Sequence, residues 1–289
     1  MPRFGVFLPQ LRMTFDALLE RTLAAEAAGF DSVWLMDHLA APALPEADCF
    51  EGWTLATALA ARTSRIRIGH LVLCDAFRHP ALLAKMAATL DVISGGRLEL
   101  GLGWGSVPGE LEAFGFGHEP AAVRAARLAE TLDVLRLLLG GERVDYAGRF
   151  FRLAGAIARP RPLQDPLPIH VGGAGEQLTL PLAARTASWW NCPSYAAGRL
   201  AALAPQAAPA RISVQHPVAL LRDERERAAA AALAERRFGA WGGLLVGTAE
   251  ELAERFAAEA ALGAELFVLQ FHDFGAPDTL AAFAEGVGI

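Results

Sequence analysis

The stretch Arg97–Gly105, "RLELGLGWG", carries the two features on which the fold depends. Leucines occupy every second position from Leu98 to Leu102, which is typical of a buried strand. Glycines then occupy every second position from Gly101 to Gly105. A strand that ends on nearly bare backbone indicates either a tight turn crowded by neighbouring backbone, or a flat or anionic ligand lying against the chain. The glycines alone leave both explanations open.

The same strand pattern recurs along the whole chain, and helix-like segments separate one strand from the next. Thr14 is expected to cap the first of these helices, and Thr248 with Glu251 forms a capping box for a later one. Several strands are apolar on both faces, as parallel strands buried under helices are. The expected strands are Arg3–Pro9, Asp31–Asp37, Arg65–Leu73, Arg97–Gly103, 168–173, 188–193, Arg211–Leu221 and Glu265–His272.

Eight evenly spaced strands alternating with helices predict an α/β protein with a (β/α)₈ TIM barrel. A doubly wound sheet gives a similar pattern, but the even spacing and the number of strands favour the barrel. The segment Trp104–Leu167 is too long for an ordinary loop after a strand. It contains a helix-like stretch, Val123–Leu139, followed by the pattern of a hairpin in "RVDYAGRFFRL". The proline-rich stretch Arg159–Pro168 then leads to the fifth strand. We therefore predict one domain over residues 1–289, with residues 104–167 inserted after the fourth strand as a lid or ligand-holding element.

Composition excludes several classes of protein. The chain has 289 residues and a formal charge of −6 with both signs spread along it, so nothing suggests binding to nucleic acid or to an anionic membrane. No apolar stretch is long enough to span a bilayer, and the N-terminus lacks the features of a signal peptide. Cys49, Cys74 and Cys192 have no metal-like spacing, and neither do the histidines. We expect a cytoplasmic protein without a metal site that acts on a small molecule.

In a TIM barrel the active site lies at the C-terminal ends of the strands. Asp37 and His38 follow the second strand, and a histidine there can move a proton near neutral pH, although a structural role is the alternative. The segment Gly172–Gly175 is a glycine-rich turn that leads into a helix. Its N–H groups and the helix dipole suit a phosphate, although an ordinary turn would look the same.

Together, several stretches resemble the luciferase-like monooxygenase superfamily, in order and over nearly the whole chain. The stretches are "GFDSVWLMDHL", "LAARTSRIRIG", "LLAKMAATLDVISGGRLELGLG", "ELEAFGF", "RPRPLQDPLPIHVGGAG" and "ASWWN". The position of Trp104 and the motifs "WLMDHL" and "SGGRLELGLG" are most similar to those of the deazaflavin branch, which uses coenzyme F-420. The resemblance implies a barrel with an insertion after the fourth strand, usually a homodimer, that binds F-420 or FMN at its C-terminal mouth.

The resemblance also implies roles for individual residues. His38 matches the histidine that serves as base in deazaflavin sugar-phosphate dehydrogenases. A cis peptide bond behind the flavin ring would join Leu71 and Val72. The cofactor-binding residues that it implies are Asp37, Leu71, Val72, Gly103, Trp104, Gly105, Gly172, Gly173, Ala174 and Gly175, the last four forming the phosphate-binding turn.

One departure from the family pattern bears on the substrate. Those sugar-phosphate dehydrogenases carry a glutamate acid just after the glycine run, where this chain has Ser106, and Glu110 is a reserve candidate for the acid. The resemblance favours hydride transfer between coenzyme F-420 and a small organic substrate. The alternatives are an FMN-dependent monooxygenase that uses oxygen and a non-catalytic flavin-binding barrel.

Overall fold

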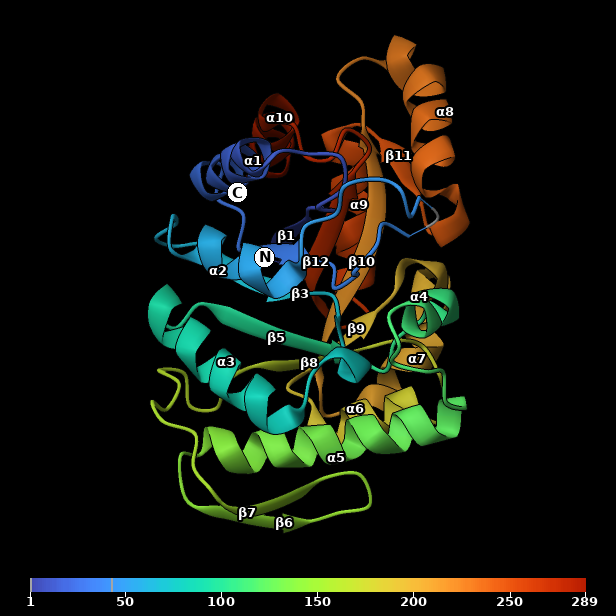
Figure 1. Cartoon of the computed structure of the whole chain (residues 1–289). Coiled ribbons are helices and arrows are strands. Elements are labelled where there is room, and N and C mark those ends of the chain that lie inside the picture. Colours follow the sequence, from blue (N-terminus) through green and yellow to red (C-terminus); the bar gives the residue numbers. More distant parts are fainter. Residues whose placement is uncertain (1, 43) are drawn as a thin grey trace.

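The computed structural model describes residues 2–42 and 44–289, and it confirms the TIM barrel (Figure 1). Ten parallel strands form one sheet, and eight of them close into the barrel because β9 pairs with β10 and β12 pairs with β1. The eight are β1 (Arg3–Phe7), β2 (Ser32–Leu35), β3 (Arg67–His70), β5 (Leu98–Gly103), β8 (Ile169–Gly172), β9 (Trp189–Cys192), β10 (Arg211–Leu220) and β12 (Ala264–Phe271).

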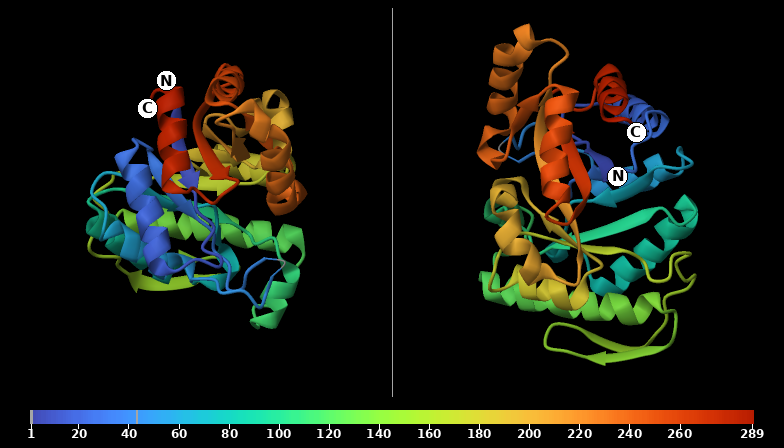
Figure 2. Two further views of the ribbon diagram at one scale, coloured as in Figure 1. Left: turned by 90° about the horizontal axis from the view of Figure 1, so that it is seen from above. Right: turned by 180° about the vertical axis from the view of Figure 1, so that it is seen from behind.

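Helices surround the barrel, and the main core lies between them and the strands (Figure 2). The predicted caps are present: the Thr14 hydroxyl accepts the N–H of Ala17, and Thr248 and Glu251 form the capping box. The outer helices are α1 (Phe15–Ala27), α2 (Gly52–Ala60), α3 (Pro80–Ser94), α5 (Ala121–Leu139), α6 (Thr179–Thr186), α7 (Leu200–Ala207), α8 (Arg227–Phe238), α9 (Ala249–Ala260) and α10 (Pro277–Val287). In the described part of the chain, no helix combines the length and apolarity that a membrane span needs.

Three local details differ from the sequence-based expectation. Helix α6 begins at Thr179, not at Glu176, because the N–H groups of Thr179 and Leu180 both bond to the carbonyl of Gly175 and close a turn first. The helix expected from Tyr195 begins as a 3₁₀ turn, Ser194–Arg199, before α7. A short strand, β11 (Leu245–Gly247), pairs with the end of β10 and was not predicted.

The inserted segment connects β5 to β8, which are neighbours in the barrel. It contains the six-residue helix α4 (Pro108–Ala113), the long helix α5, and an antiparallel hairpin of β6 (Val144–Ala147) and β7 (Arg152–Ala156). The views in Figures 1 and 2 agree that the hairpin lies outside α5, away from the barrel. The part of the insertion that lines the mouth of the barrel is its start, from Trp104 to Leu111 in α4.

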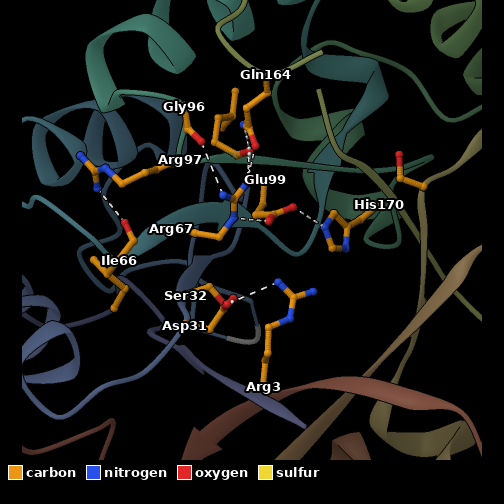
Figure 3. A network of polar contacts seen from close by, with 12 residues as sticks. Arg3, Asp31, Ser32, Ile66, Arg67, Gly96, Arg97, Glu99, Gln164 and His170 are labelled. Atoms are coloured by element: carbon orange, nitrogen blue, oxygen red, sulfur yellow. Dashed lines mark hydrogen bonds and ion pairs between the residues drawn. The ribbon is translucent and has the colours of Figure 1, made fainter. Parts of the chain in front are cut away.

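A buried polar network closes the opposite, N-terminal end of the barrel (Figure 3). Glu99 of β5 forms an ion pair with Arg67 and receives a 2.7 Å bond from the ring of His170. Burial raises the pKa of Glu99, but His170 and Arg67 outweigh this effect and hold the pKa below its ordinary value. Gln164, at the end of the insertion, donates to the carboxylate of Asp91 at 2.7 Å and so ties the returning chain to this end. Groups at this face of a TIM barrel serve stability.

Candidate active site at the mouth of the barrel

A cavity of about 480 Å³ lies at the C-terminal ends of the strands. Ser106 and Glu110 line it, together with every residue that the sequence assigned to the site. Those residues are Asp37, His38, Leu71, Val72, Gly103, Trp104, Gly105, Gly172, Gly173, Ala174 and Gly175. The fold therefore brings together residues from the ends of β2, β3, β5 and β8, as a parallel barrel should.

His38 is paired with a carboxylate that sequence reasoning treated only as a reserve acid. The Nδ1 atom of His38 lies 2.8 Å from Oε2 of Glu110, which is carried by α4 in the insertion. The other oxygen, Oε1, accepts the N–H groups of Leu39 at 2.6 Å and Ala40 at 3.1 Å. The side chains are 22% and 8% exposed, so the pair is largely shielded from water but opens into the cavity.

The Asp37 carboxylate is already bonded within the protein, so it is not free to bind a cofactor. Arg78 donates two bonds to it, at 2.6 and 2.9 Å, and the N–H of Cys74 donates a third at 2.8 Å. Its side chain is only 1% exposed. The carboxylate is therefore occupied in fixing the segment after β3, and Arg78, which sequence reasoning missed, is its main partner.

The peptide bond between Leu71 and Val72 is cis, as the family resemblance implied. The Val72 side chain then lies between β5 and β8. A Cβ added at Gly103 would come within 2.6 Å of Val72 Cγ2, and one at Gly172 within 2.9 Å of Cγ1. These glycines are thus required by the packing of the protein itself, and Gly105 is required by its positive φ of 83°.

The glycine turn after β8 retains part of its expected capacity for an anion. The N–H of Gly173 donates to the carbonyl of Asn191 at 3.2 Å, so this group is already used. The N–H groups of Ala174 and Gly175 bond to no main-chain carbonyl among the described residues; that of Ala174 faces the Tyr195 hydroxyl, and both residues line the cavity. Thr179, the first residue of α6, also lines it. A helix N-terminus with free N–H groups favours a phosphate or carboxylate.

Further residues at the cavity were not singled out from the sequence. Gln215 lies within β10 and lines the cavity, and the strict alternation of "RISVQHP" could have placed it on the inner face. Tyr195 lies in the 3₁₀ turn after β9, where no periodic signal marks it. Burial raises the pKa of the Cys74 thiol to about 12, so this cysteine is not a thiolate nucleophile.

Comparison with known proteins supports the resemblance. Residues 1–208 match the family model described as luciferase-like monooxygenase. The chain belongs to the luciferase-like monooxygenase family. It is 37% identical over 187 residues to the F420-dependent glucose-6-phosphate dehydrogenase of Microbacterium testaceum strain StLB037, a match that covers 61% of this chain and 52% of that one. It is 33% identical over 220 residues to the F420-dependent hydroxymycolic acid dehydrogenase of Mycobacterium tuberculosis, covering 75% and 59%.

The chain thus spans little more than half the length of these curated luciferase-like relatives. Solved structures of similar fold cover nearly all of it. The monooxygenase RslO1 from Streptomyces bottropensis is 25% identical with a TM-score of 0.81 and covers 99% of this chain and 98% of its own. An F420-dependent secondary alcohol dehydrogenase, bound to an F420-acetone adduct, is 20% identical with a TM-score of 0.83 and covers 99% of both chains.

Proposed function

We propose that this protein is a deazaflavin-dependent oxidoreductase that moves a hydride between coenzyme F-420 and a small organic substrate. The observation that carries the proposal is the cavity itself, which presents the His38–Glu110 pair and the N–H groups of a glycine turn in one space. The naming of the curated relatives as F420-dependent dehydrogenases supports the choice of cofactor.

The residues present fit the coenzyme. The N–H groups of Ala174 and Gly175, in the turn that precedes α6, would hold its phosphate. Val72 and Trp104 line the same cavity and would contact a flat ring system. When bound, the deazaflavin supplies or accepts a hydride and leaves only proton movement to the protein.

His38 is then the residue that moves the proton. In the direction of substrate oxidation it removes the proton of a substrate hydroxyl, and in reduction it returns that proton to the oxygen. A positioned general base or acid of this kind contributes roughly 10² to 10⁴ in rate. Ser106 stands where the sugar-phosphate dehydrogenases have their acid, so glucose 6-phosphate is not the expected substrate.

The second candidate is an FMN-dependent monooxygenase, which the full-length similarity to RslO1 favours. In that case the bound flavin would supply the reaction with oxygen, and His38 would hold or move a proton beside it. A non-catalytic barrel is the third candidate. Assembly as a homodimer and a cytoplasmic location are implied by the sequence and the family resemblance, and they stay predictions.

The test is turnover under anaerobic conditions. Loss of F-420 absorbance should be followed with a panel of alcohols, and reoxidation of the reduced coenzyme with the matching ketones. We expect turnover without oxygen and a rate at least a hundredfold lower in His38→Ala, following the magnitude for general-base catalysis. His118→Ala changes an exposed loop histidine and should keep the wild-type rate. Activity that requires both oxygen and reduced FMN would instead identify a monooxygenase.

A further inference from the structure

The Glu110 carboxylate makes more bonds to the β2 loop than to its own helix. It lies in the insertion, 72 residues after His38, yet one oxygen bonds the His38 ring and the other bonds two backbone N–H groups just after it. We infer that Glu110 is the positioning residue of His38: it fixes which ring nitrogen carries the proton, and it depends on the docking of α4 to do so. The consequence for catalysis rests on the proposed function.

The hydrogen bonds determine the tautomer. An ionised carboxylate only accepts hydrogen bonds, so Oε2 must accept from Nδ1 of His38. The neutral ring then carries its hydrogen on Nδ1 and has a lone pair on Nε2. Because His38 lines the cavity, Nε2 is the atom that would take the substrate proton, and the carboxylate would stabilise the imidazolium that forms. A base oriented by a third group is the arrangement found in hydrolase triads.

No other carboxylate beside His38 is available for this role in the described structure. Asp37 is its neighbour in the chain, but the carboxylate of Asp37 is held by Arg78 and the N–H of Cys74. The thiol of Cys49 donates to the main-chain carbonyl of His38 at 3.7 Å, and it is not a carboxylate. The ring orientation therefore depends on Glu110.

Helix α4 has few other attachments to the barrel. Leu111 is its only buried side chain, at 1% exposure, and residues 112–120 are all exposed. The three hydrogen bonds of Glu110 are thus a large share of what keeps α4 in place. Because the same carboxylate holds α4 in place and orients the His38 ring, the ring is oriented only when α4 is docked.

The decisive variant is Glu110→Gln. The amide oxygen should replace Oε1, because the N–H groups of Leu39 and Ala40 need an acceptor. The amide NH₂ group then faces Nδ1 of His38, and this nitrogen must become the acceptor. The substitution should therefore move the ring hydrogen to Nε2 while the backbone bonds remain.

The tautomer can be read directly by ¹⁵N NMR of histidine-labelled protein without coenzyme, at a pH where the ring is neutral. His38 is assigned from the signal lost in His38→Ala. We expect the Nδ1–H form in the wild type and the Nε2–H form in Glu110→Gln. Glu112→Gln, an exposed change on the same helix, should keep the Nδ1–H form. An Nε2–H form in the wild type, or the same tautomer in wild type and Glu110→Gln, would overturn the inference.

The wild-type spectrum tests the inference even if a variant does not fold. Measurements of kcat and KM then distinguish the positioning role of Glu110 from the proposed role of His38 as base. If His38 is the base, Glu110→Gln should lower kcat at least a hundredfold with KM changed by less than about threefold, because Nε2 is no longer free to accept a proton. An inverted tautomer with unchanged kcat would uphold the positioning role of Glu110 and refute the role of His38 as base.

Discussion

Replacing Arg78 with methionine should destabilise the protein by about 3–5 kcal/mol. Arg78 makes two short bonds to Asp37 in a place where the two side chains are 10% and 1% exposed. Methionine fills most of the volume, but it leaves the carboxylate buried with only the N–H of Cys74 as donor. Breaking a buried pair by removing one partner typically costs 3–5 kcal/mol. The bond from Arg78 to Glu51 adds little, because Glu51 is 39% exposed.

The measurement is urea unfolding followed by circular dichroism, with stability taken from the midpoint at an unchanged slope. The double variant Asp37→Asn with Arg78→Met has no buried charge left and should regain about 2 kcal/mol or more of the loss. Arg62→Met removes an exposed arginine and should change stability by less than about 0.5 kcal/mol. A cost below about 1 kcal/mol for Arg78→Met, or a double variant as unstable as the single one, would show that the buried Asp37 charge does not depend on Arg78.

Two further predictions concern the anion site and the acid limb of stability. Ala174→Asp places a negative charge beside the N–H groups of the turn and should weaken binding of F-420 by about fivefold to several hundredfold, from 1–4 kcal/mol of repulsion, in a fluorescence titration. Ala174→Asn has nearly the same shape and should bind normally; equal affinities for the two variants would exclude a phosphate there. For Glu26, burial raises the pKa, but the N–H groups of Ile66, Arg65 and Ser64 outweigh it and lower the pKa from 4.5 to about 2. The stability advantage of the wild type over Glu26→Gln should therefore be complete above pH 4.5 and vanish as the pH falls towards 2, and a constant difference over that range would contradict the role of Glu26.

Local patterns were enough to predict the barrel and the positions of its caps. The alternation of Leu98–Leu102 and the capping residues Thr14 and Thr248 act within a few residues of themselves, and the structure confirms each. Partnerships between distant segments were not predictable in this way. Nothing near Arg78 in the sequence marks it as the partner of Asp37, 41 residues earlier.

The glycines show the same limit. Their positions indicated a crowded strand end, but the sequence alone could not say what crowds it. The structure names Val72 as the neighbour of Gly103 and Gly172, and Thr179 as the neighbour of Gly173 and Gly175. The placement of His38 after a strand was sufficient to nominate it, whereas its bond to Glu110 depends on how the insertion folds back over the mouth.

The exposed residues 112–120 lie between the first four and the last four strands of the barrel. Strands β1, β2, β3 and β5 precede them, and β8, β9, β10 and β12 follow them. The first half carries His38 with its partner Glu110 and the cis bond, while the second half carries the glycine turn after β8. A chain cut within residues 112–120 would hold the proposed proton-moving pair in one fragment and the proposed anion-binding turn in the other. Neither half-barrel would form a cavity alone, and activity would return only when the two reassociate.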